Sequence, residues 1–173
     1  MPGSGKVSPV EGEAVYHCLA RTVNGERLLD DPVQEILRRQ LWQAADYCGL
    51  QILTYAILSN HFHVLVRVPP DSQISDAELL RRYRVMYPKP ILYQAARFDV
   101  IEAQLKTGGP EADTWRKRQH ALMGDISQFM KLVKQRFSVW FTAVMARSGR
   151  NASSPSCSNP KAACSKRWPP TST

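Results

Sequence analysis

The sequence predicts an α+β fold in which an antiparallel sheet carries its helices on one face. Three short segments are apolar runs or alternate apolar and polar residues, as strands do, and two of them follow each other across a tight turn. Two longer segments place apolar residues at helical spacing. Each of these helices therefore has one apolar face that it can bury against the sheet.

The hydrophobic pattern, together with capping and stop residues, defines the individual helices and strands. Asp31 is the expected N-cap of the first helix, with Pro32 at its first position and Gly49 as its stop. Asp125, followed by Gln128 at the capping-box position, begins the last helix. The predicted elements are strands at 14–21, 52–58 and 61–68 and helices at 31–48 and from 125 onward.

Between the third strand and the last helix, residues 71–123 are expected to form a helical insertion. Ser75 and Glu78 form a capping box, and Gly108-Gly109 interrupts the pattern later on. Without this insertion the order is β-α-β-β-α, which is a ferredoxin-like (RRM-like) unit that lacks its last strand. We expect one domain over residues 9–145 and a disordered tail over 146–173.

Composition indicates a soluble protein with reduced thiols. The chain has 173 residues, of which 43% are hydrophobic, and no apolar run approaches the roughly 18 residues that a membrane span needs. Four cysteines show no CxxC spacing, and the N-terminus does not resemble a signal peptide. The expected location is therefore the cytoplasm, and no membrane partner is expected.

The charge is positive but uneven. The formal net charge is +8, which makes nucleic acid the first partner to consider, although a solvated basic surface is the plain alternative. Three of the basic residues lie in the acid-free stretch 151–173, and eight lie in 115–150 against the single acid Asp125. If nucleic acid binds, the stretch 115–150 is the expected contact.

His61-Phe62-His63 at the head of the third strand is the most informative motif. Side chains two positions apart on a strand point to one face, so both imidazoles project together while Phe62 enters the opposite, apolar face. Two imidazoles side by side form half of a divalent metal site. The alternative is that the rings lie on the sheet surface and bind no metal.

Several other residues have a functional and a structural interpretation. Arg67 lies on the strand face of the two histidines and could contact a phosphate, while Lys131, Lys134 and Arg136 could do so from the last helix; solvated surface is the alternative for all four. His17 is more simply a structural residue than a third metal ligand. The aromatic residues of the last helix have helical spacing, which favours core packing over base stacking; they are Phe129, Phe137, Trp140 and Phe141.

The segments YHCLAR, VNGERLL, ILTYAILSNHFHVLVRVP and GDISQFMKLVKQRFSVWF resemble, in this order, the single-tyrosine HUH transposases, in particular the REP-associated and insertion-sequence types. The resemblance covers about residues 9–142, and NHFHVLV is its most specific part. It implies metal-dependent cleavage and transfer of single-stranded DNA in transposition, with Mg²⁺ or Mn²⁺ held by His61 and His63. It also implies a tyrosine nucleophile that forms a 5′-phosphotyrosine intermediate, and often a homodimer.

The resemblance stops at the nucleophile. The family continues with a fourth strand and a helix that carries the tyrosine in a block of the form Met-Ala-x-Tyr-Ile-Asp, whereas this chain has no tyrosine after Tyr93. A shifted reading frame would turn Met145-Ala146 into glycine and Trp168-Pro169 into alanine whatever the codons, and permits the tyrosine block over 167–173. We therefore expect a truncated or frameshifted chain, which the nucleotide sequence around codons 140–146 would test.

These observations predict a chain that binds single-stranded or hairpin DNA but forms no phosphotyrosine adduct, because no catalytic tyrosine is identified. One alternative is a non-catalytic single-stranded or hairpin DNA-binding or regulatory domain that uses the same sheet. A second alternative is a metal hydrolase of small phosphoesters, whose affinity for its substrate would depend little on salt.

Overall fold

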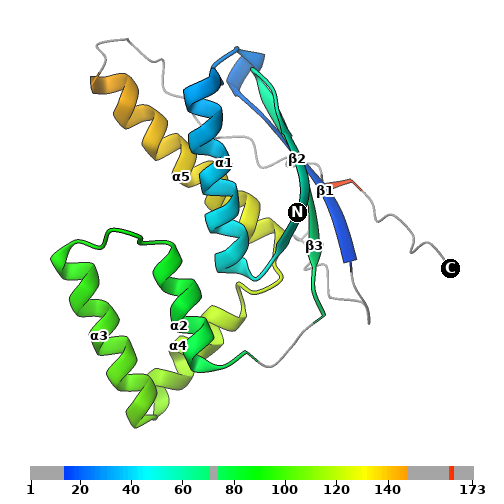
Figure 1. The fold of residues 1–173 in the computed structure, drawn as a ribbon. Helices are drawn as coiled ribbons and strands as arrows, with labels where there is room; N and C mark the ends of the chain where they lie inside the picture. Colours follow the sequence, from blue (N-terminus) through cyan, green and yellow to red (C-terminus); the bar gives the residue numbers. More distant parts are fainter. Residues whose placement is uncertain (1–13, 71–73, 148–163, 166–173) are drawn as a thin grey trace, which may run out of the picture.

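The computed structural model describes residues 14–70, 74–147 and 164–165, and it has the α+β fold that the sequence predicts. Three antiparallel strands form the body of the sheet, and two long helices, α1 and α5, cover one of its faces (Figure 1). Three further helices form a separate group beyond the end of the sheet. No helix within the described ranges is both long and apolar enough to cross a membrane.

The sheet has the order β2-β3-β1-β4, which is the ferredoxin-like order. Its main strands are β1 (Ala14–Arg21), β2 (Gln51–Ile57) and β3 (His61–Val68), all paired antiparallel. The central pair β1–β3 is continuous along eight residues, whereas a register shift between Ile52 and Thr54 interrupts the pairing of β2 with β3.

The fourth position of the sheet holds only two residues. Strand β4 (Cys164–Ser165) pairs antiparallel with His17 and Cys18 of β1, where the last strand of a ferredoxin-like unit lies. Both residues lie within the tail that was predicted to be disordered, and in the structure they pair with β1. The rest of the predicted tail, 148–163 and 166–173, lies outside the described residues.

The N-cap of helix α1 (Asp31–Cys48) lies one residue earlier than expected. The N-cap is Asp30, whose side-chain oxygen accepts a hydrogen bond from the Val33 amide at 3.1 Å. At the other end Gly49 adopts φ = 67°, as predicted for the stop. An added Cβ at Gly49 would also meet a guanidinium nitrogen of Arg82, so this flexible side chain would have to move.

Helix α5 (Ile126–Arg147) begins as predicted, with the Asp125 carboxylate accepting a hydrogen bond from the Gln128 amide at 3.0 Å. It extends two residues past the expected domain end at 145 and so includes Ala146 and Arg147. Its apolar face joins α1 and the sheet in one core. The most fully buried side chains of that core include Leu37 and Leu41 of α1, Val64 and Val66 of β3, and Phe129 and Val133 of α5.

The predicted insertion is helical and consists of α2 (Asp76–Val85), α3 (Leu92–Thr107) and α4 (Pro110–His120). It is attached to α1 by an ion pair between Arg81 and Asp46 at 2.6 Å. The Tyr47 hydroxyl donates a buried hydrogen bond to the side-chain oxygen of Gln119 at 3.1 Å. These contacts hold the insertion against the end of α1, away from the turn between β2 and β3 (Figure 1).

Candidate functional site

The sheet face opposite α1 and α5 carries the two predicted metal ligands. Along β3, Phe62 and Val64 are buried in the core with the helices, so His61 and His63 leave the strand on the other side. We call this side the histidine face. Its residues on the two central strands are Val15, His17, Leu19 and Arg21 of β1 and His61, His63, Leu65 and Arg67 of β3.

Three imidazoles cluster at one end of the histidine face. His17 Nε2 lies 2.9 Å from His63 Nδ1, and the two rings are stacked with centroids 5.0 Å apart and an interplanar angle of 7°. The His61 ring lies edge-on to His63, with centroids 5.1 Å apart. His17, which the sequence analysis treated as a structural residue, is thus a direct neighbour of the predicted pair.

The turn before β3 sets the orientation of His61. Asn60 Nδ2 donates a hydrogen bond to the Gly25 carbonyl at 3.1 Å, which leaves Asn60 Oδ1 directed at His61 Nδ1, 2.7 Å away. An amide oxygen only accepts, so His61 Nδ1 carries the proton in this arrangement. The lone pair of His61 is therefore on Nε2.

The environment of His63 favours its neutral form. Desolvation lowers the pKa of His63 below its usual range, and repulsion from His17, His61 and Arg21 lowers it further. If His63 Nδ1 donates to His17 Nε2, the lone pair of His63 also lies on Nε2. Both rings of the predicted pair then use Nδ1 for a neighbour, as metal-ligating histidines commonly do.

The residues present fit a two-histidine metal centre with open coordination positions. Among the described residues, no group of three or more His, Cys, Asp or Glu side chains is arranged to hold a metal ion, and the 2.9 Å contact of His17 Nε2 with His63 Nδ1 makes His17 a partner of His63. Imidazole suits transition-metal cations, whereas Mg²⁺ prefers oxygen. The donor set therefore fits Mn²⁺ better than Mg²⁺.

Arg21 lies beside the histidines, and the sequence analysis did not identify it as a site residue. It is directly opposite His61 in the β1–β3 register, its side chain is exposed, and its charge contributes to the lowered pKa of His63. The alternation within AVYHCLAR, which puts Arg21 on the strand face of His17, was the available signal. Its guanidinium is placed to contact an anion that approaches the two histidines.

The other predicted contacts lie elsewhere. Arg67 shares the histidine face but is four strand positions from His63, which corresponds to roughly 13 Å along β3. Lys131, Lys134 and Arg136 belong to α5 and thus to the helical layer on the opposite side of the sheet (Figure 1). The structure does not bring these four residues together with the histidine pair.

No tyrosine of the described strands points from the histidine face. Tyr16 packs against the core, and Tyr55 pairs with the buried Val64 and so belongs to the helix side. Tyr47 is buried on α1, where desolvation raises its pKa well above the usual value. The aromatic residues of α5 are core residues as predicted, with Phe129 and Phe141 buried and Phe137 and Trp140 packed against them.

Comparison with known proteins gives a family match over part of the chain. Residues 12–83, which contain the histidine face, match the family described as "Transposase IS200 like". A crystal structure described as "a putative transposase" from Deinococcus radiodurans R1 shares 22% identity over 49% of this chain and 69% of that chain, with a TM-score of 0.34. A comparison with curated proteins finds no match.

Proposed function

We propose that this chain, whose residues 12–83 match the family described as "Transposase IS200 like", acts as a transposase of that family and binds single-stranded or hairpin DNA for metal-dependent strand cleavage and transfer. The observation that carries this proposal is the pair of imidazoles on the histidine face, each with Nδ1 engaged and Nε2 unused in the hydrogen bonds described above. That pair lies inside the segment that matches the family.

Each residue at the site has a distinct task in this proposal. His61 and His63 hold Mn²⁺ or Mg²⁺, which when bound polarises the scissile phosphate and stabilises charge on its oxygens. Asn60 and His17 fix the two rings, so that their Nε2 lone pairs are available without reorganisation. Arg21 contacts the phosphate next to the metal-binding pair.

The covalent step is the part of the family chemistry that this chain is proposed to lack. A phosphotyrosine requires a tyrosine oxygen beside the scissile phosphate, and no tyrosine of the described strands points from the histidine face. We expect no covalent adduct when the chain is incubated with a single-stranded hairpin oligonucleotide and Mn²⁺. An adduct mapped to any tyrosine would overturn this expectation.

The second candidate function is a non-catalytic DNA-binding or regulatory domain that uses the same face. The position of the strand tyrosines favours it: none within the described strands points from the histidine face, and binding needs only the metal pair and Arg21. Both candidates contact DNA, but only the first would form a covalent adduct with it.

The homodimer expected from the resemblance remains a prediction, which sedimentation of the free chain would test.

Fluorescence anisotropy with a labelled hairpin oligonucleotide tests the DNA contact itself. We expect binding that strengthens with Mn²⁺ and weakens as salt rises, with a slope of about −0.7 in log K against log salt for each phosphate contacted. Arg21→Ala is expected to reduce the steepness by about one such contact. Affinity that does not change with salt or with Mn²⁺ would contradict the proposal and favour a site for small phosphoesters.

His17 is predicted to act as a positioning residue for His63. His17→Ala removes the partner of His63 Nδ1, and loss of such a partner typically weakens metal affinity about 10- to 100-fold. His17→Gln retains an accepting oxygen and is expected to restore part of that loss. Calorimetric titration with Mn²⁺ measures both variants, and ¹⁵N chemical shifts of His63 report its tautomer; unchanged affinity and tautomer in His17→Ala would remove the role.

A further inference from the structure

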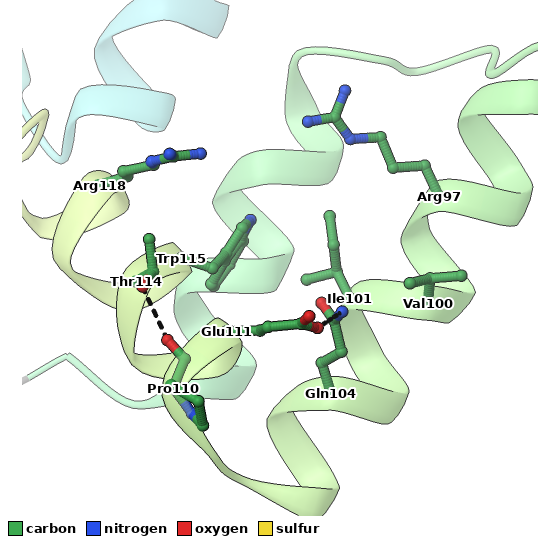
Figure 2. Close-up of a pocket in the computed structure, with 9 residues that line it drawn as sticks. All are labelled: Arg97, Val100, Ile101, Gln104, Pro110, Glu111, Thr114, Trp115 and Arg118. Atoms are coloured by element: carbon green, nitrogen blue, oxygen red, sulfur yellow. Dashed lines mark hydrogen bonds between the residues drawn. The ribbon is translucent and has the colours of Figure 1, made fainter.

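An open hollow lies between helices α3 and α4 of the insertion, and the proposed function does not use it. Its volume is about 490 Å³, which is within the range of small-molecule sites. Figure 2 shows that Arg97 of α3 and Arg118 of α4 extend over it from opposite sides, with Trp115 between them. Glu111 and Gln104 lie toward the other end and contact each other.

The two arginines carry positive charge that the insertion does not neutralise. Other basic residues of the insertion form ion pairs; these are Arg81 with Asp46, Arg82 with Glu78, Arg84 and Lys106 with Glu102, and Arg116 with Asp76. Arg97 and Arg118 form no ion pair within the described part of the chain, and both are exposed. An anion above Trp115 would therefore meet two available guanidinium groups.

Trp115 is held as a flat wall of the hollow. Its ring is half-buried and meets the Tyr83 ring edge-on, with centroids 5.9 Å apart and an interplanar angle of 81°. The nearby Thr114 hydroxyl donates to the Pro110 carbonyl at 2.7 Å and is thereby engaged within α4. The hollow thus offers an aromatic surface, positive charge at one end, and the amide and carboxylate of Gln104 and Glu111 at the other.

This combination matches one nucleotide of a single strand. A phosphate pairs with arginine through charge-assisted hydrogen bonds, and a base stacks on an aromatic ring without regard to sequence. Gln104 and Glu111 can donate and accept hydrogen bonds at a base edge. A neutral or purely apolar ligand would leave both arginines unpaired, so a nucleotide accounts for more of the lining.

We propose that the hollow between α3 and α4 binds a nucleotide of the DNA strand that the histidine face contacts, with phosphate at Arg97 and Arg118 and base on Trp115. This inference rests on the proposed function. The seven steps of β3 from His61 to Val68 already span roughly 23 Å, so a single mononucleotide cannot reach both places and a strand of several nucleotides is needed. The insertion would thereby add affinity through a second, linked contact.

The test compares two double variants of the full chain in binding a labelled 20-nucleotide single strand with Mn²⁺. Arg97→Ala with Arg118→Ala removes the hollow's two cations and is expected to weaken binding about 10-fold or more and to reduce the salt slope by roughly 1.4. Lys106→Ala with Lys117→Ala removes the same charge from the same two helices outside the hollow. This control pair is expected to change affinity less than 3-fold.

Each outcome decides between the two proposals. Equal weakening by the two double variants, or wild-type affinity for a free mononucleotide equal to that for the 20-nucleotide strand, would overturn the hollow as a strand contact. In both cases Mn²⁺-dependent binding by the wild type would leave the proposed function intact. A wild-type chain that binds no single strand would instead overturn the proposed function, and this inference with it.

Discussion

Replacing His61 with alanine is expected to lower the affinity for Mn²⁺ about 100-fold or more. The variant removes one of the two imidazoles proposed to bind the cation, and loss of an outer partner alone already costs 10- to 100-fold at such sites. It also leaves Asn60 without its contact to Nδ1. Isothermal titration of the chain with Mn²⁺ alone, in the absence of DNA, measures the effect without any assumption about activity.

His120→Ala provides the matched control for that titration. His120 is an exposed histidine at the end of α4, far in sequence from the cluster on the histidine face. Its loss removes the same side chain from the protein surface and is expected to leave Mn²⁺ affinity within about 2-fold of the wild type. Equal affinities for wild type, His61→Ala and His120→Ala would mean that the histidine pair does not bind the metal.

Phe129→Ala is expected to destabilise the fold by about 3–5 kcal/mol. Phe129 is completely buried on α5, inside the core that joins α1, α5 and the sheet. Truncating its ring removes apolar contacts and leaves a cavity that rigid neighbours fill only in part. Urea unfolding followed by circular dichroism measures the change in the free energy of unfolding.

Val139→Ala on the same helix separates core packing from helix propensity. Val139 is 67% exposed, so its truncation removes few buried contacts. It is expected to change the free energy of unfolding by less than about 0.5 kcal/mol. Similar costs for the two variants would show that α5 does not pack as described.

The helices and strands were predictable from local sequence patterns because clear capping, turn and stop residues mark their ends. The strand at 14–21 coincides with β1, and the glycine stop of α1 and the Asp125 cap of α5 are where the sequence places them. The N-cap of α1 was predicted one residue late, because Asp30 and Asp31 are both competent caps. Only the geometry shows which side chain reaches the Val33 amide.

The site was predictable only where it depends on a single strand. Period-two alternation is enough to place His61 and His63 on one face. The contributions of His17 and Arg21 depend on the β1–β3 register, which pairs Arg21 with His61 and which short-range patterns do not specify. The polar face of α5 was identified correctly as exposed or partly exposed, but the sheet separates Lys131 and Lys134 from the histidines.

The most direct test of the metal-binding claim is a Mn²⁺ titration of protein labelled with ¹³C and ¹⁵N in its histidines, followed by NMR. The paramagnetic ion broadens signals of the nearest rings first. We predict that His61 and His63 signals disappear at the lowest Mn²⁺ concentrations, His17 next, and His120 last. Broadening of His120 together with the other three, or no selective broadening at all, would contradict a metal centre on the histidine face.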